Sequence, residues 1–312
     1  MRAIWDVRRV PRAEGKTFLV TGGNAGIGYF VAEQLAGSGA TVVLGSRSDE
    51  KAAAAMDSIR GRVPGARVRH LRLDLSDLPS LKSSVDGLDG LDAVVLNAGV
   101  LFDEPPRRET AEGNEVMFAT NYLGHFALTG LLAPLLSDGG GRVVTTGSFT
   151  AKSVELNPDD LQSTRDYEPK RAYSRSKLAQ MLFGFELDRR LRAVGSSVAS
   201  VVTHPGGALD SLTPSRPPVH VRTTGQRLRA MPAGVLLQGK DAGAWTAVRA
   251  VLDPEVRGGQ MWGPRMFGMR GAPRLEAVRG RLADERLAAR VWDAGVELTG
   301  VEPGFGTGQA RG

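Results

Sequence analysis

The chain contains 312 residues, a length that suits one large α/β domain or two smaller ones and that can bury a full hydrophobic core without metals or disulfides. Because the sequence has no cysteine, it excludes disulfides, zinc fingers, iron–sulfur clusters and thiol nucleophiles. Hydrophobic residues make up 41% and charged residues 24%, which is typical of a globular protein and argues against disorder or a collagen-like fibre.

The net charge of +6 comes from 40 Lys and Arg residues, of which 7 are lysine, against 34 acidic residues. The basic residues are scattered, so the charge predicts a solvated surface and no nucleic-acid partner. No apolar run approaches the ~18 residues that a membrane span needs, and no apolar segment follows the basic N-terminus. We therefore expect a cytoplasmic protein without a membrane span. The histidines lack metal-ligand spacing, which predicts structural roles and no metal site for His70, His125, His204 and His220.

The predicted elements alternate between strands and helices. Residues 1–13 form an N-terminal extension, and residues 16–21 form a first strand that ends in a glycine-rich turn. A helix with apolar residues at helical spacing follows and ends at Gly37-Ser38-Gly39. Continuous apolar strands between helices predict a single-domain, doubly wound parallel sheet of Rossmann type, with helices on both faces. The further predicted elements are 40–44, 67–73, 77–88, 91–96, 112–136, 142–146, 171–194, 197–203, 243–252 and 259–262.

Two long segments interrupt this alternation, residues 149–169 and residues 206–239. Both are predicted binding loops, because loops of this length in a compact domain are usually functional or disordered. We expect 206–239 to be a mobile substrate lid, since it follows the sixth strand at the carboxyl edge of the sheet and carries four prolines. The domain is predicted to span residues 14–302, and the glycine-rich residues 303–312 to form a flexible tail.

Three glycines, Gly22, Gly26 and Gly28, lie between the first strand and the helix that follows it. At such a turn the free N–H groups and the helix dipole favour a pyrophosphate. The spacing Gly-x-x-x-Gly-x-Gly differs from the Gly-x-Gly-x-x-Gly fingerprint of dinucleotide-binding folds, and a plain tight turn would also explain the glycines. A dinucleotide site is therefore one interpretation, which needs support from other residues.

The end of the second strand bears on the choice of cofactor. Dinucleotide-binding folds that select NAD present an acidic residue here to the adenosine ribose, whereas this strand ends in Ser46-Arg47. An arginine can hold a 2′-phosphate through a bidentate contact, and a carboxylate would repel it. The residue therefore favours NADP(H) over NAD(H), although Arg47 could also be one more surface arginine.

Tyr173 and Lys177 begin a long helical pattern, and their i, i+4 spacing places them on one face. A phenol titrates near ~10 and does not lose its proton at neutral pH unless a nearby cation stabilises the phenolate. A lysine one turn away can supply that charge. The pair therefore predicts an acid/base group with an adjacent cation.

Several motifs in this order resemble the short-chain dehydrogenases/reductases over about residues 14–265. The segments Asn121-Tyr122-Leu123-Gly124-His125-Phe126 and His204-Pro205-Gly206 are most similar to the retinol-dehydrogenase-like branch, as is the separation of 25 between Ser148 and Tyr173. The motifs that carry the resemblance are Thr21-Gly22-x-x-x-Gly26-x-Gly28, Asp74-Leu75, Asn97-Ala98-Gly99, Asn121, Ser148, Tyr173-x-x-x-Lys177 and Pro205-Gly206.

The resemblance implies roles for four catalytic residues. Tyr173 would be the general acid/base that exchanges a proton with the substrate oxygen. Lys177 would lower the pKa of Tyr173 and hold the nicotinamide ribose. Ser148 would hydrogen-bond the substrate oxygen, and Asn121 would hold a water that links Lys177 to solvent. Taken singly, each residue could instead be an ordinary strand end, cap or turn residue.

The resemblance also implies a set of cofactor-binding residues. Asp74 would contact the adenine, Asn97 and Gly99 would let the backbone approach the cofactor, and Pro205-Gly206 would meet the carboxamide. Asp210 and its neighbours depart from the family pattern, because many relatives carry a Thr or Ser a few residues after Pro-Gly. The full set is Gly22, Asn24, Gly26, Ile27, Gly28, Ser46, Arg47, Asp74, Leu75, Asn97, Ala98, Gly99, Tyr173, Lys177, Pro205 and Gly206.

We therefore expect an NADP(H)-dependent oxidoreductase that transfers a hydride between nicotinamide and an alcohol/carbonyl pair. Apolar residues of the two long segments favour a bulky hydrophobic substrate. One alternative is a C=C reductase related to protochlorophyllide reductases, and another is a non-catalytic NADP(H)-binding regulator, against which the intact Ser148, Tyr173 and Lys177 count. The resemblance is also compatible with a homodimer or homotetramer. The apolar candidates are Phe149, Leu156, Leu209, Leu212, Met231, Val235 and Leu236.

Overall fold

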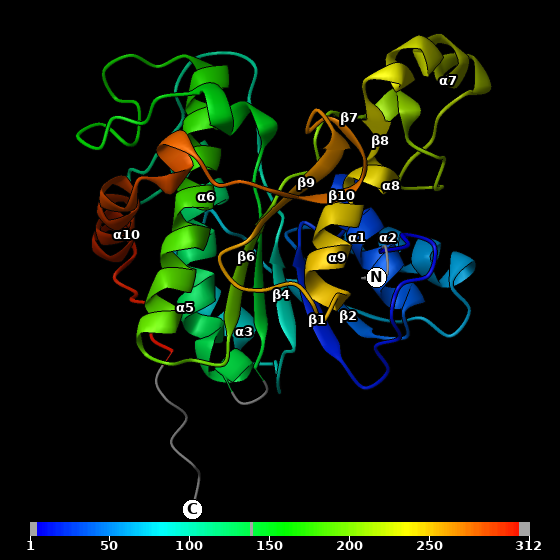
Figure 1. The fold of residues 1–312 in the computed structure, drawn as a ribbon, viewed down its shortest axis with the longest axis horizontal. Coiled ribbons are helices and arrows are strands. Elements are labelled where there is room, and N and C mark those ends of the chain that lie inside the picture. The colour runs from blue at the N-terminus through cyan, green and yellow to red at the C-terminus, as the bar shows by residue number, and fades with distance from the viewer. Residues whose placement is uncertain (1–4, 138–139, 306–312) are drawn as a thin grey trace, which may run out of the picture.

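The computed structural model describes residues 5–137 and 140–305. An eight-stranded sheet runs through its centre in the order β10-β9-β6-β5-β4-β1-β2-β3 (Figure 1). All neighbouring strands are parallel except β9 and β10, which form an antiparallel hairpin at one edge. The strands are β1 (Thr17–Thr21), β2 (Thr41–Ser46), β3 (Arg67–Arg72), β4 (Ala93–Leu96), β5 (Arg142–Thr146), β6 (Ala199–Thr203), β9 (Met261–Met266) and β10 (Arg270–Glu276).

The strand order places the crevice where a ligand can bind. β1 pairs with β2 on one side and with β4 on the other, so the direction of winding reverses at β1. In open α/β sheets ligands bind beside such a reversal, at the carboxyl ends of the strands. β4 is buried along its whole length, which explains its continuous apolar sequence Ala93-Val94-Val95-Leu96. The predicted doubly wound sheet is confirmed, with one antiparallel edge strand added.

Helices cover both faces of the sheet (Figure 1). One hydrophobic layer joins the sheet to helices α1, α2 and α9, and the other joins it to α3, α5, α6 and α10. The helices are α1 (Gly26–Gly37), α2 (Asp49–Arg62), α3 (Leu81–Val85), α4 (Val116–Phe118), α5 (Gly124–Ser137), α6 (Pro169–Ala193), α7 (Thr224–Ala230), α8 (Lys240–Gly243), α9 (Trp245–Leu252) and α10 (Glu285–Thr299). Short 3-10 turns lie at Leu78–Ser80, Phe149–Ser153, Asp210–Leu212, Met231–Val235 and Gly280–Ala283, and a π-helical turn, η2, joins α4 to α5 at Ala119–Leu123.

Three elements that the sequence did not predict have physical explanations. α2 contains few bulky apolar residues and therefore shows no strong apolar period, although Ser48 caps it by accepting a hydrogen bond from Lys51 N at 3.2 Å. α10 buries a narrow stripe, in which Trp292 stacks on Phe183 of α6 with ring centroids 5.8 Å apart. β10 has mostly exposed or half-buried side chains, as expected of an edge strand.

The continuous helical stretch Val116–Leu136 has the length and composition of a membrane span, with a hydropathy of 1.2. The prediction that no apolar run approaches that length overlooked this stretch. However, 83% of it is buried inside the fold, against the sheet and the neighbouring helices. It is therefore the core helix of a globular domain.

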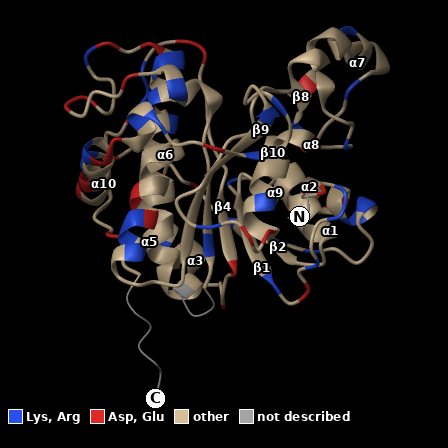
Figure 2. Cartoon of the chain, in the orientation of Figure 1, with Lys and Arg blue, Asp and Glu red and all other residues tan. Residues whose placement is uncertain are grey.

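The ends of the domain differ slightly from the predicted boundaries. Phe305 is only 5% exposed and belongs to the hydrophobic core, so residues 303–305 are packed and the predicted tail begins too early. Residues 306–312 of that tail lie outside the described residues. In the N-terminal extension, Ala13 is buried and its N–H donates to Ser38 O at 2.9 Å. Positive and negative side chains are mixed over the face seen in Figure 2.

Candidate active site

The carboxyl ends of six parallel strands surround a cavity of about 610 Å³. Fourteen of the sixteen residues in the predicted cofactor set line it. The other two shape its walls: a Cβ on Gly28 would overlap the carbonyl of Gly22, and a Cβ on Gly206 would lie 2.5 Å from Met269 O. The lining residues that the prediction omitted are Thr21, Ala25, Gly45, Ser48, Lys51, Leu73, Val100, Leu101, Thr120, Thr146, Gly147 and Lys240.

The glycine turn leads into a helix end that is open to a ligand. Gly22 and Gly26 have φ angles of +66° and +59°, which side chains with a Cβ rarely adopt. The N-cap residue of α1, Ala25, provides no side-chain hydrogen bond, and the first turn carries no acidic residue. The first N–H groups of α1 and the positive end of its dipole therefore face the cavity without a side-chain partner, which suits an anionic group such as a pyrophosphate.

Basic side chains lie at the end of the cavity beyond β2. Arg47 and Lys51 both line it. Ser46 is held by His70, whose Nε2 is 3.1 Å from Ser46 Oγ, while His70 Nδ1 lies 3.2 Å from Asp49. No acidic residue occupies the position at the end of β2. The arrangement therefore presents positive charge to a ligand that reaches this end.

Asp74 lies on the cavity wall as predicted, but its carboxylate is partly used within the chain. It accepts hydrogen bonds from Ser76 N at 2.9 Å and from Ser76 Oγ at 2.6 Å. The residue therefore closes a local turn and also lines the cavity.

The hydroxyl of Thr21 connects the glycine turn to the loop after β4. Thr21 Oγ1 accepts hydrogen bonds from Asn97 N and Ala98 N, both at 2.9 Å. The same oxygen lies 2.8 Å from His125 Nε2 and 3.3 Å from Val95 O. His125 Nδ1 lies 3.0 Å from Asn121 O and 3.0 Å from Gln180 Nε2. These contacts join the glycine turn to the π-helical turn and to α6.

His125 is fully buried and stays neutral. Burial lowers its pKa to about 3, the nearby charge of Lys177 lowers it further, and only the hydrogen bond to Asn121 O opposes them. The prediction gave His125 a structural role, and the structure adds that this role lies inside the site. Within the described residues, no group of three or more His, Cys, Asp or Glu side chains could hold a metal ion.

Asn121 sits in the π-helical turn η2 and joins three segments. Its Oδ1 accepts from Val100 N at 2.7 Å, and its Nδ2 donates to Val100 O at 3.1 Å and to Ser176 Oγ at 2.9 Å. The side chain therefore ties the loop after β4 to α6, next to Lys177. Its predicted role in holding a water stays a prediction.

Tyr173 of α6 lines the cavity, and Ser148, which follows the end of β5 and is not among the lining residues, hydrogen-bonds it. Burial raises the pKa of Tyr173, and a hydrogen bond with the Ser148 side chain opposes that rise. Ser148 also caps the following turn, where its Oγ accepts from Thr150 N at 3.3 Å. The predicted lowering of the Tyr173 pKa by Lys177 is not found. Burial dominates, so the phenol keeps its proton at neutral pH.

Lys177 makes contacts that the sequence analysis did not predict. Its ammonium donates to Thr146 O at 2.7 Å and to Gln180 Oε1 at 2.6 Å. Gln180 is itself fixed, because its Nε2 donates to Leu96 O at 3.0 Å. Complete burial without a carboxylate partner lowers the pKa of Lys177 to about 7. The signal was available in the sequence, since Gln180 lies three residues after Lys177 on the same helix face.

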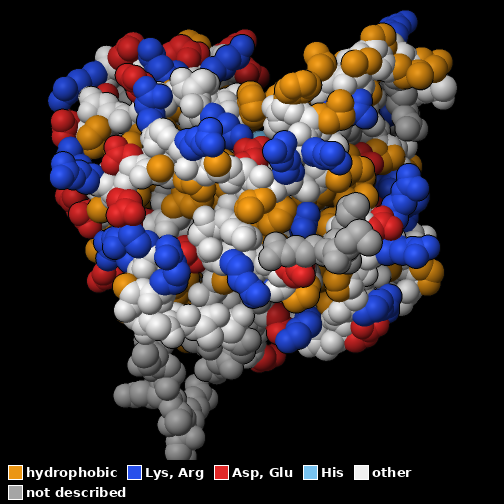
Figure 3. All heavy atoms as spheres, viewed as in Figure 1, with side chains coloured by type: hydrophobic (Ala, Val, Ile, Leu, Met, Phe, Trp, Pro, Cys, Tyr) orange, Lys and Arg blue, Asp and Glu red, His pale blue; other side chains and the backbone are white. Residues whose placement is uncertain are grey.

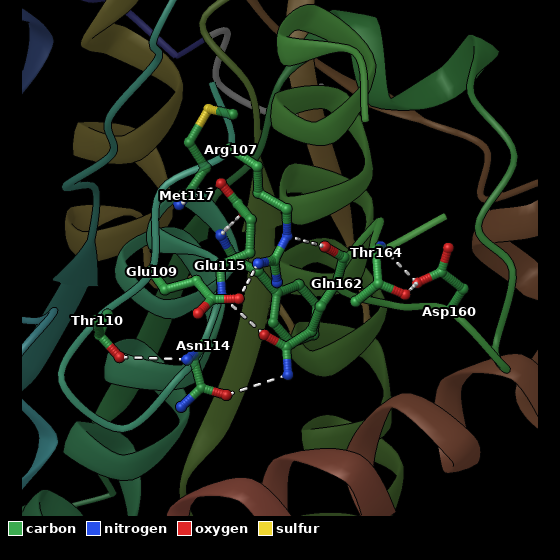
Figure 4. A network of polar contacts seen from close by, with 10 residues as sticks. Arg107, Glu109, Thr110, Asn114, Glu115, Met117, Asp160, Gln162 and Thr164 are labelled. Carbon is green, nitrogen blue, oxygen red and sulfur yellow. Dashed lines mark hydrogen bonds and ion pairs between the residues drawn. The ribbon is translucent and has the colours of Figure 1, made fainter. Parts of the chain in front are cut away.

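The polar segment 149–169 is tied to the chain before α4 (Figure 4). Gln162 Oε1 accepts from Glu115 N at 2.7 Å, and its Nε2 donates to Asn114 Oδ1 at 3.1 Å. The carboxylate of Glu115 caps α4, accepting from Met117 N at 3.0 Å and from Phe118 N at 2.6 Å. This network fixes the start of the helix that carries Asn121.

A second polar cluster supports the turn that carries Ser148. Lys152 Nζ lies 2.5 Å from Glu276 Oε2, and His204 Nε2 lies 3.1 Å from Glu276 Oε1. Although burial opposes it, the hydrogen bonds and charges of His204 and Lys152 lower the pKa of Glu276 to about 2. The cluster therefore joins the turn after Ser148 to β10 and to the residue before Pro205.

Asp210, at which the sequence departs from the expected family pattern, has a clear structural role. Its carboxylate lies 2.6 Å from Lys240 Nζ and 3.3 Å from Arg222. Although burial opposes it, the hydrogen bond and charge of Lys240 and the charge of Arg222 lower the pKa of Asp210. These ion pairs hold together the two ends of the segment 206–239.

The chain is similar to several known proteins. The family model for short chain dehydrogenases matches residues 16–209. The chain is 34% identical to polyprenol dehydrogenase of Homo sapiens over 93% of this chain and 87% of that protein, and 33% identical to retinol dehydrogenase 14 of Mus musculus over 92% and 86%. A crystal structure of an uncharacterised protein from Mycobacterium paratuberculosis is 34% identical, covers 96% of this chain and 99% of that chain, and has a TM-score of 0.78.

The contact between Gln180 and Lys177 predicts that substitutions of Gln180 will change the pKa of Lys177. Gln180→Leu removes one of the two acceptors of the ammonium, so the pKa of Lys177 should fall by roughly one pH unit or more below about 7. Gln180→Glu should raise it. The measurement is an NMR titration of carbon-13-labelled lysine, with the Lys177 signal assigned from Lys177→Arg.

Gln34→Leu is the matched control, because Gln34 bonds to Asp241 O at 2.9 Å and not to a lysine. An unchanged Lys177 titration in Gln180→Leu would show that Gln180 has only a packing role.

Proposed function

We propose that the chain transfers a hydride between NADP(H) and the alcohol/carbonyl pair of a bulky hydrophobic molecule. The premise is its family: the chain belongs to the short-chain dehydrogenase family and to its retinol-dehydrogenase-like branch. Membership of the family makes it an oxidoreductase of nicotinamide chemistry. One observation carries the finer proposal. Tyr173 and Lys177 line the same cavity as the uncapped N-terminus of α1, and the side chain of Ser148 hydrogen-bonds Tyr173.

The residues around the cavity fit a nicotinamide dinucleotide. The turn Gly22–Gly28 and the first N–H groups of α1 would hold the pyrophosphate. Asp74 and Leu75 would face the adenosine, and Asn97 to Gly99 with Pro205 would face the nicotinamide end. When bound, the cofactor supplies the hydride chemistry, and the protein supplies position and electrostatics.

Tyr173 acts on the proton of the substrate oxygen. Because burial keeps its pKa above the usual value, the phenol is protonated at neutral pH and can donate to a carbonyl oxygen as that carbonyl is reduced. Ser148 Oγ, which already contacts the phenol, can donate a hydrogen bond to the same oxygen. In the oxidative direction Tyr173 must accept the proton, and the hydrogen bond with Ser148, which opposes the rise of its pKa, would stabilise the resulting phenolate.

Arg47 and Lys51 support the choice of NADP(H). Both line the cavity at the end of β2, where folds that select NAD present a carboxylate. A 2′-phosphate placed there would meet two cations and no acidic side chain at the strand end. This charge arrangement favours NADP(H) over NAD(H).

The proposed substrate class rests on the relatives and on the cavity rim. Two relatives are named for a polyprenol and for retinol, which are long apolar alcohols. Leu101 lines the cavity and is 46% exposed, and Phe149, which follows Ser148 in the chain, is 39% exposed. These apolar surfaces suit a hydrophobic substrate. A mobile lid at 206–239, an oligomeric state and a cytoplasmic location stay predictions.

The role of Tyr173 predicts the effect of removing its hydroxyl. Tyr173→Phe should lower kcat by roughly 10²–10⁴-fold, because the ring stays and only the transferable proton is lost. The dissociation constant for NADPH should change little. Turnover is measured with NADPH and hydrophobic aldehydes or ketones, and wild-type kcat in the variant would disprove the assignment.

Arg47 predicts the cofactor preference. The wild-type protein should bind NADPH more tightly than NADH, and Arg47→Asp should abolish or reverse that preference by replacing attraction of the 2′-phosphate with repulsion. Fluorescence titration with both cofactors measures the ratio of dissociation constants. Arg72→Asp is a control, since Arg72 pairs with Asp49 outside the cavity lining. Equal affinities in the wild type would contradict the proposal.

A further inference from the structure

Five exposed apolar side chains are concentrated within residues 221–236 of the segment 206–239. Among the described residues they are unusually exposed, between 60% and 67%. Figure 3 shows hydrophobic side chains gathered over α7, the part of the molecule that projects farthest from the sheet on that side. Exposed apolar clusters on one projecting element indicate an interaction surface. We call this surface the lid tip: Val221, Leu228, Met231, Val235 and Leu236.

The base of the segment is anchored, which leaves the tip as the part that can contact a partner. Arg216 forms an ion pair with Glu33 of α1 at 2.7 Å. His220 stacks on Phe30 of α1, with ring centroids 5.3 Å apart. At the other end, β7 (Ala208–Leu209) pairs with β8 (Gln238–Gly239). None of the lid-tip residues lines the 610 Å³ cavity, so the bound cofactor does not cover them.

The charge of the segment 206–239 indicates what kind of partner the lid tip would bind. Residues 211–240 contain five basic residues and no Asp or Glu, and residues 206–210 add only Asp210. Some of the bases are paired at the anchored end, but Arg229 is exposed beside Leu228. Apolar side chains interspersed with arginines on a projecting element match a surface with an apolar interior and anionic groups above it.

We propose that the lid tip docks on a lipid bilayer that carries negatively charged headgroups. The apolar side chains enter the interface, and the arginines remain at headgroup level. This proposal rests on the proposed function in one respect: a hydrophobic alcohol or carbonyl is dissolved in the bilayer, so docking brings the mouth of the site to its substrate.

A second copy of the chain fits the lid tip less well than a bilayer does. In a symmetric dimer through this surface, two copies of residues 221–236, each with three arginines and no acidic residue, would face each other. That repulsion opposes a second copy of the chain. A bilayer with anionic headgroups satisfies both the apolar side chains and the positive charge.

The test is co-sedimentation with vesicles of phosphatidylcholine, with and without phosphatidylglycerol, in the absence of cofactor and substrate. The wild-type protein should sediment with the mixed vesicles, less with phosphatidylcholine alone, and less at high salt. Met231→Ser/Val235→Ser/Leu236→Ser should lower partitioning at least roughly tenfold, because the apolar contact is lost. NADPH affinity should be unchanged, since these residues lie outside the cofactor cavity.

A matched pair of single variants isolates the surface. Val235→Ser should weaken vesicle binding, whereas Val194→Ser should not, although Val194 is also 50% exposed, at the far end of α6. The proposal is overturned if the wild type does not bind mixed vesicles, or if the triple variant binds as well as the wild type. It is also overturned if the triple variant instead converts a dimer to a monomer. Because vesicle binding is measured without turnover, a failure of the proposed enzyme activity would be seen separately.

Discussion

The hydroxyl of Thr21 is the contact on which the rest of the site depends. β1 lies at the reversal of the sheet, and the residue at its carboxyl end must join the glycine turn to the neighbouring strand. Thr21 Oγ1 does this by accepting two backbone N–H groups from the loop after β4 and by contacting His125 of α5 at 2.8 Å. One side chain thus connects the glycine turn, the loop after β4 and α5, and through His125 it reaches the π-helical turn.

The interior around this contact contains polar side chains but few charges, and this determines the protonation states of the residues in the site. His125 is neutral, and Lys177 is surrounded by a carbonyl and an amide oxygen instead of a carboxylate. Burial therefore acts without strong compensation: it lowers the pKa of Lys177 to about 7 and raises that of Tyr173. The phenol is therefore protonated and can donate to a substrate oxygen, and it lies beside a lysine that titrates near neutrality.

The features predictable from the sequence are those that adjacent residues determine. A strand, a glycine turn and a helix place Gly22 and Gly26, and the i, i+4 spacing on α6 places Tyr173 and Lys177. The contacts that were missed join residues far apart in the chain, such as Thr21 with His125, or depend on one narrow face, as in α10. Gln180 shows the limit most clearly, because its spacing from Lys177 was visible but its acceptor role depends on Leu96 O of a separate strand.

The central claim is that the Thr21 hydroxyl holds the cofactor cavity and the catalytic residues as one unit, and comparison of Thr21→Ser with Thr21→Val tests it most directly. Serine keeps the hydroxyl, whereas valine keeps the shape and leaves the N–H groups of Asn97 and Ala98 without this acceptor, at a cost of ~1–3 kcal/mol for a buried group. NADPH titration of the folded variants should give near wild-type affinity for Thr21→Ser and a loss of about tenfold or more for Thr21→Val. Equal affinity in both variants would contradict the account.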